Sequence, residues 1–386
     1  VGLDAGRRIC PATDGTAADG AAASADDRLD FLPTSLAVRA DRLRVGGRSF
    51  NRLVAGGSRE GSEWRANLDA EQLNGYVAYR PSDAGQAGHV YARLSRLDLP
   101  PTAATEVEEL LEQPATVPAL DIQVEDFILS GRPLGRVEVQ ASNRGAAAQR
   151  EWRLERLRVV VPEAQLQASG SWSRPPGPRL EAPRQTALNF RLDIEDSGRL
   201  LERFGQPGVV RGGQGRIGGR IGWAGSPLAL DYPSLEGQIY ADIASGQFLK
   251  VEPGAAKLLG VLNLQALPRR LTLDFRDVFT EGFAFDFVRG DARIEDGVMD
   301  TNNLQMRGVN AAVLLEGKAD IARETQDLKV VVVPEINAGT AALIATAINP
   351  VIGIGTFVAQ FLLSQPLQAA STQEFRISGT WADPQV

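Results

Sequence analysis

The stretch VPALDIQVEDFILSGRPLGRVEVQ, residues 117–140, contains the pattern that decides the fold. Apolar and polar side chains alternate through Ile122 and Val124, a turn follows at Gly131, and the alternation resumes at Val137. Such alternation is typical of a β-strand with one buried face, and a glycine-containing turn between two such runs indicates a hairpin. The stretch therefore predicts a pair of antiparallel strands that share one apolar face.

The same arrangement occurs earlier in the chain. Pro33 and Pro118 open the two units, and a Trp-Arg pair, at 64–65 and 152–153, opens the third strand of each. This agreement indicates an internal β repeat of about 85–95 residues. We therefore expect a flexible linker or loop at 1–30, repeats over 31–173 (about 31–100 and 117–173), and a further β domain over 186–386 that includes apolar helices at 340–364.

Strand-like alternation continues to the end of the chain, for example in ALNFRLDIED (187–196) and GFAFDFVRG (282–290). We predict roughly fifteen to twenty strands against four or five short helices. Too few helical residues are available to cover the apolar face of so many strands. The strand pattern leaves open a closed barrel, a two-layer sandwich, and an open groove whose apolar lining is covered by something else.

One of the short helices is well marked. Asp196 or Ser197 can serve as the N-cap, and Gly205 can end the helix. Its apolar face is predicted to contain Leu200, Leu201 and Phe204.

Between Glu335 and Glu374 there is no charged residue, in a chain where 23% of residues are charged. Asn349 and Pro350 suit the start of a helix, so we predict a short helix, a hinge at these two residues, and a second helix. One apolar stripe follows the second helix. The stripe consists of Ile354, Phe357, Val358, Phe361 and Leu362. A cap on the sheet, contact with a membrane, and a full membrane span all remain open.

Composition excludes several classes of function. The net charge is −7, and basic residues are interspersed with acidic ones, which argues against a nucleic-acid partner. Cys10 is the single cysteine, so an internal disulfide or a cysteine-rich metal site is excluded. His89 is the single histidine and starts a strand-like run, so we interpret it as a surface residue rather than a member of a catalytic triad. We expect no metal and no cofactor.

Two patterns suggest chemistry but lack the required context. Gly213, Gly215 and Gly218 match the dinucleotide-binding spacing, but a strand-like run follows instead of a helix, which indicates a bulged glycine-rich strand and no nucleotide. The carboxylates of the C-terminal half would be needed for a paired-acid hydrolase, but they alternate with apolar residues as outward-facing strand positions do. The most prominent are Asp274, Asp277, Asp286, Asp291, Glu295 and Asp296.

From residue 190 onward the chain resembles the C-terminal region of the YhdP family, within the AsmA-like proteins of Gram-negative bacteria that include TamB. The similarity extends over long runs in the same order. They are LLERFG (200–205), PGAAKLLGVLNLQALPRRLTLDFRDVFTEGFAFD (253–286), DARIEDGVMDTNNLQMRG (291–308), VVVPEINAG (331–339), AINPVIGIGTFVAQFLL (347–363) and ISGTWADPQV (377–386).

The resemblance implies a mainly β fold, an elongated, curved antiparallel β-groove with an apolar inner face. It implies a periplasmic, non-enzymatic lipid conduit that supports the outer-membrane barrier, with phospholipid acyl chains as its cargo. The C-terminal end would reach the outer membrane. The chain begins at Val1 rather than Met, so we expect it to be cut from a longer protein whose N-terminal anchor contacts the inner membrane.

We expect the groove to be lined by apolar residues of one parity on successive strands. They are Ile122, Val124, Val137, Val139, Leu188, Phe190, Leu192, Leu271, Leu273, Phe275, Phe283, Phe285, Leu304 and Met306. Two alternatives stand beside the conduit. One is a scaffold that assembles outer-membrane proteins or envelope polymers, and the other is a carboxylate-based envelope hydrolase.

Overall fold

The computed structural model describes most of the chain from residue 34 onward. The described residues are 34–45, 48–83, 87–100, 117–145, 151–175, 183–227, 229–249, 283–308, 311–334, 353–356, 358 and 372–385. The predicted lining residues Leu271, Leu273 and Phe275, the hinge Asn349 and Pro350, and the stripe residues Phe357, Phe361 and Leu362 lie outside these ranges.

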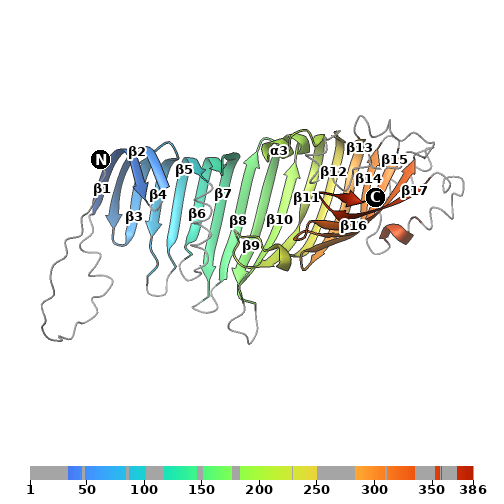
Figure 1. Ribbon diagram of the computed structural model, residues 1–386. Helices are drawn as coiled ribbons and strands as arrows, with labels where there is room; N and C mark the ends of the chain where they lie inside the picture. Colours follow the sequence, from blue (N-terminus) through green and yellow to red (C-terminus); the bar gives the residue numbers. More distant parts are fainter. Residues whose placement is uncertain are drawn as a thin grey trace, which may run out of the picture.

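The described residues form one open, curved sheet of eighteen strands, which confirms the predicted β-groove architecture (Figure 1). The strands are β1 (Ser35–Val45), β2 (Arg48–Glu60), β3 (Glu63–Asp69), β4 (Leu73–Arg80), β5 (His89–Leu99), β6 (Ala119–Leu129), β7 (Arg132–Arg144), β8 (Glu151–Val161), β9 (Ala164–Ser173), β10 (Gln185–Ile194), β11 (Val210–Ala224), β12 (Glu236–Phe248), β13 (Phe283–Glu295), β14 (Val298–Gly308), β15 (Ala311–Asp320), β16 (Thr325–Pro334), β17 (Gln373–Thr380) and β18 (Pro384–Gln385).

Each strand pairs with the next strand in the sequence, so the sheet grows in chain order from β1 to β18. The pairs are antiparallel except β5 and β6, which run parallel. At ~4.8 Å between strands the sheet is about 80 Å long. β9 and β10 pair along their whole length, so the sheet continues without a break between the predicted repeats and the predicted C-terminal domain.

Glycines show toward which face the sheet curves. A Cβ added to Gly170 or Gly219 would meet the backbone carbonyl oxygen of the neighbouring strand, at Ala187 and Gln238 respectively. Both glycines belong to the face on which the apolar residues Leu188 and Phe190 lie, because each is paired opposite one of them. On this apolar side the backbone of the neighbouring strand lies close to each glycine. The sheet therefore curves toward its apolar side, as glycine kinks commonly permit.

The last long strands are apolar on both faces, which explains the uninterrupted runs AAVLL (311–315) and VVVV (330–333). Val313 and Val332 face the concave side. On the convex side Ile354 and Val358, from the uncharged segment, are fully buried against the sheet. Their neighbours there are Ala312, Leu314, Val331 and Val333.

The predicted short helix is confirmed as α3 (Ser197–Arg203), which lies on the upper edge of the sheet in Figure 1, beside the first residues of β11. Asp196 is its N-cap and accepts a hydrogen bond from the backbone N–H of Arg199 at 3.0 Å. One detail of the prediction is wrong: Phe204 is 42% exposed rather than part of the apolar face. The helix ends at Arg203, and Phe204 is its C-cap.

A half-buried ion pair fastens α3 to the turn between β8 and β9. The Arg203 guanidinium donates two hydrogen bonds of 2.8 Å to the Glu163 carboxylate and a third to the Pro133 carbonyl. The hydrogen bonds from Arg203 hold the pKa of Glu163 below its usual value. A carboxyl with a depressed folded-state pKa stabilises the fold above its unfolded pKa of ~4.3, and this contribution is lost as the pH falls through the folded-state value.

We therefore expect hydrogen-exchange protection factors in α3 to fall when the pH is lowered below about 4. Arg203→Met should lower this protection at neutral pH and remove most of its pH dependence. Arg199→Met is the matched control, because Arg199 is exposed and its contact with Asp196 is 3.7 Å. Equal protection in the two variants at pH 7 would show that the pair does not hold α3.

Candidate functional site: an apolar lane along the concave face

The register of the sheet places the predicted lining residues on one face. Residues directly opposite each other in neighbouring strands share a face, and so do alternate residues within a strand. Val124 pairs with Val137. Following the cross-strand pairs onward through β8 and β9, and stepping to the alternate residue within β10, leads to Phe190. From there it leads through β11 and β12 to Val288, which pairs with Met306. All eleven predicted lining residues that lie in described ranges belong to this face, which we call the apolar lane.

Charged side chains are almost absent from the lane. Among the paired residues of β3 to β17 that the structure describes, the one charged residue on this face is Arg132, at the first position of β7. Leucine, valine, isoleucine and phenylalanine occupy most of the other positions, interspersed with alanine and glycine. The lane therefore presents a nonpolar surface that crosses the strands.

Packing within the lane is tightest at the C-terminal end. Phe285, Met306 and Val330 are at most 6% exposed and belong to a cluster that runs from β13 to β17. Further towards the N-terminus the lane residues Phe190, Ile217 and Ile239 are only half-buried. Nonpolar side chains in the middle of the sheet therefore remain accessible to a nonpolar ligand.

The convex face carries the charges, and they are paired across strands. Asp193 accepts hydrogen bonds from Arg191 and Arg216, which together hold its pKa below its usual value. Arg289 contacts Asp242 on the neighbouring strand at 3.1 Å. These exposed pairs stabilise the sheet only slightly, but they keep this face hydrated.

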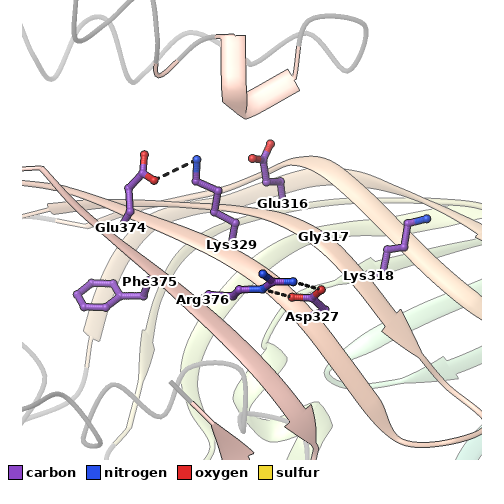
Figure 2. Close-up of a pocket in the computed structure, with 8 residues that line it drawn as sticks. All are labelled: Glu316, Gly317, Lys318, Asp327, Lys329, Glu374, Phe375 and Arg376. Carbon is purple, nitrogen blue, oxygen red and sulfur yellow. Dashed lines mark hydrogen bonds and ion pairs between the residues drawn. The ribbon is translucent and has the colours of Figure 1, made fainter.

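A shallow depression of ≈ 620 Å³ on the convex face shows the same arrangement (Figure 2). Arg376 binds Asp327 through two hydrogen bonds of 2.7 and 2.8 Å, and Lys329 lies 3.1 Å from Glu374. The guanidinium of Arg376 lowers the pKa of Asp327, so this carboxyl is ionised at neutral pH. A carboxyl of this kind is poorly suited to donate a proton.

Three of the carboxylates considered for a hydrolase, Asp291, Glu295 and Asp296, line one open depression of ≈ 1070 Å³, and two of them are paired with neighbouring side chains. Asp286 contacts Arg307, Glu295 contacts Arg293, and Asp291 accepts a hydrogen bond from the Asn303 amide. Asp274 and Asp277 lie outside the described residues. Within the described ranges no three His, Cys, Asp or Glu side chains are grouped as metal ligands.

The glycine-rich motif lies within a strand, as predicted, and not between a strand and a helix. Gly213, Gly215 and Gly218 are all part of β11, and Gly213 has a φ of 88°. A Cβ at Gly213 would meet the Ser197 side chain of α3. The motif therefore serves to pass β11 closely beneath α3. His89 is the first residue of β5.

The uncharged C-terminal segment lies on the convex side where it is described. Gly355 donates its backbone N–H to the Glu316 carboxylate at 3.2 Å, and Ile354 is buried against the sheet. These residues are therefore separated from the apolar lane by the strands themselves. No helix in the part of the chain that the structure describes is long and apolar enough to cross a membrane.

Sequence reasoning used Trp64 and Trp152 as markers of the repeat but did not place any tryptophan on the lane. Trp152 and Trp172 are direct cross-strand partners, and Trp223 lies two strands further on, in β11, opposite Thr186 of β10. The feature of the sequence that could have identified them is their position, since each lies within two residues of the end of a strand.

A long open sheet that grows in chain order, with charges on its convex face and a nonpolar lane on its concave face, defines a β-groove protein. The chain belongs to the YhdP family, whose model, described as YhdP protein, matches residues 11–386. This confirms the resemblance found in the sequence. Over 341 residues the chain is 28% identical to the intermembrane phospholipid transporter YhdP of Escherichia coli strain K12. The matched part covers 88% of this chain and 25% of the relative, so the chain spans about a quarter of the relative's length. No solved structure matches the chain.

Proposed function

We propose that this chain is one part of a non-enzymatic conduit that carries phospholipids between the inner and outer membranes, with acyl chains lying on the apolar lane. The observation that carries the proposal is the continuity of the lane from β3 to β17, with every charged residue described in these paired strands except Arg132 on the other face. The relative's name, an intermembrane phospholipid transporter, supports the same cargo. The full protein would be anchored in the inner membrane, cross the periplasm and reach the outer membrane at its C-terminal end.

The energetics of lipid transfer favour such a surface. A two-chain lipid exposes some thirty CH₂ groups to water, and at ~0.8 kcal/mol each the cost is about 25 kcal/mol. A nonpolar lane removes much of this cost without any chemical step. Weak and uniform contacts suit passage better than one tight site, which agrees with a lane built from many similar aliphatic residues.

Adjacent residues of β12 provide a direct test. Ile239 lies on the lane and is half-buried, whereas Tyr240 lies on the convex face and is 40% exposed. With the photo-crosslinker benzoylphenylalanine at position 239, we expect phospholipid adducts by mass spectrometry. The same crosslinker at position 240 should give none.

The same experiment separates the conduit from a scaffold. A scaffold would give adducts with another protein, and no lipid adduct at either position. That result, with the variants folded as judged by circular dichroism, would overturn the proposal.

A further inference from the structure

All five tryptophans of the chain lie at the same long edge of the sheet. Trp64 and Trp152 are the second residues of β3 and β8, Trp172 and Trp223 are the penultimate residues of β9 and β11, and Trp381 follows β17. The strand directions place these five ends on one side, which we call the tryptophan rim. The opposite edge, which carries α3, has no tryptophan.

Four of these side chains belong to the apolar lane. Trp64 pairs with Tyr79, and Trp152, Trp172 and Trp223 follow one another through the paired strands. Tryptophan combines a large nonpolar ring with one N–H donor, and it is enriched where hydrocarbon meets water. Its confinement to one edge indicates that the two edges of the lane meet different parts of a bound molecule.

Polar groups accompany the tryptophans at this rim, whereas Arg132, the one charged residue of the lane among the described strands β3 to β17, lies at the opposite edge. The indole N–H of Trp172 has no hydrogen-bond partner among the described residues, although Trp172 is only 3% exposed. By contrast, Trp152 donates to the Pro118 carbonyl and Trp223 to the Ser226 carbonyl. The Arg184 guanidinium lies 4.9 Å from the centre of the Trp172 ring. The rim thus combines a buried, unused donor with a cation, the groups that recognise an ester carbonyl and a phosphate.

The dimensions also fit. A strand of eleven residues at ~3.3 Å per residue spans about 36 Å. One leaflet of hydrocarbon is about 15 Å thick, half of the ~30 Å bilayer core. A phospholipid can therefore lie along the strands with its headgroup at one rim and its chain ends short of the other.

We propose that phospholipids on the lane are oriented, with glycerol and headgroup at the tryptophan rim and chain ends toward the α3 edge. This orientation rests on the proposed function, because it assumes that phospholipid occupies the lane.

The wild-type chain contains its own reporter, since its whole tryptophan fluorescence comes from this rim. The probe is phosphatidylglycerol with a doxyl quencher at carbon 5 or carbon 16 of one acyl chain, loaded to the same bound amount as measured by electron paramagnetic resonance. We expect the carbon-5 label to quench at least twice as strongly as the carbon-16 label. In Phe127→Trp, which adds a tryptophan to the lane near the opposite edge, the added fluorescence should be quenched more strongly by the carbon-16 label.

The possible outcomes separate the two proposals. Equal quenching by both labels, or a reversed order, would overturn the orientation while leaving the lipid on the lane. Failure of either lipid to bind would instead overturn the proposed function itself.

The unused donor gives a second, atomic test. Trp172→Phe keeps a ring but lacks the N–H, so lipid retention should fall about two- to tenfold, as for one lost hydrogen bond. Tyr240→Phe is the control, because it also removes one donor from a ring, but at an exposed residue of the convex face, so retention should not change. Equal retention in the two variants would exclude Trp172 as a headgroup contact.

Discussion

Phe190→Asp should interrupt lipid passage along the lane, whereas Asn189→Asp should leave it unchanged. The two positions are adjacent in β10, so both variants add the same charge to the same strand, on opposite faces. Phe190 is half-buried among lane residues, and a carboxylate there must either lose its hydration beneath an acyl chain or exclude the chain. Asn189 is exposed on the convex face, where charges are already common.

The measurement uses photo-crosslinkers on both sides of the substitution, in cells that carry the full-length protein. Val137 lies on the lane three strands before β10, and Ile239 lies two strands after it. With Phe190→Asp we expect lipid adducts to remain on the side from which lipid enters and to fall at least tenfold on the other side. The surviving side would identify the direction of transfer. Undiminished adducts on both sides, in a folded variant, would show that the lane is not the path.

Gly219→Ala should destabilise the sheet by about 2–4 kcal/mol, a large effect for one methyl group. The added Cβ would overlap the carbonyl oxygen of Gln238 and lie 2.9 Å from the Cα of Ile239. Both contacts are with backbone, so relief requires the two strands to separate or flatten. The curvature of the groove and the pairing of β11 with β12 would be lost together.

Gly56→Ala is the control, because a Cβ there would meet nothing within 4 Å. It should be neutral or stabilise the protein by about 0.5 kcal/mol, as replacing glycine in a strand commonly does. Thermal unfolding followed by circular dichroism compares the two variants. If Gly219→Ala unfolds at the wild-type temperature, the close approach of the strands does not set the curvature.

The period-2 pattern was sufficient to predict strands and to choose lane positions of one parity within each strand. Ile122, Val124 and Phe190 share a face in the structure because each strand segment between bulges keeps its alternation. Contact of these residues with lipid stays a prediction. The concave side could not be found from alternation alone, because curvature depends on where a neighbouring backbone leaves no room for a Cβ, as at Gly219.

Irregular backbone conformations limit what the sequence pattern can show. At Ser245, with a φ of 54°, the parity of β12 reverses although its register with β11 and β13 does not change, so that Ile243 and Phe248 pack on the same cluster. A serine in the sequence gives no indication of a positive φ, since serine adopts ordinary strand geometry elsewhere. The tryptophan rim was missed for a different reason: it depends on which strand ends lie together, and the parallel pairing of β5 with β6 reverses that order partway along the chain.

The position of the uncharged segment was also not decided by its own sequence. Its apolar stripe suits a membrane or a sheet equally well, but Ile354 and Val358 pack where β15 and β16 are apolar on their second face. The relevant signal lay elsewhere, in the uninterrupted valines of 330–333. Those valines lie alternately on the two faces of the sheet, so both faces needed to be covered by other apolar residues.

The chain-order pairing of the strands has a consequence for how this protein comes to be folded. Nearly every contact in the sheet joins two strands that are consecutive in the sequence. A newly emerged strand therefore finds its partner in the strand that preceded it. Such quasi-one-dimensional structures can nucleate at any hairpin and propagate from it. The sheet can therefore assemble progressively from one terminus, and local damage should fray a few strands and leave the remainder paired.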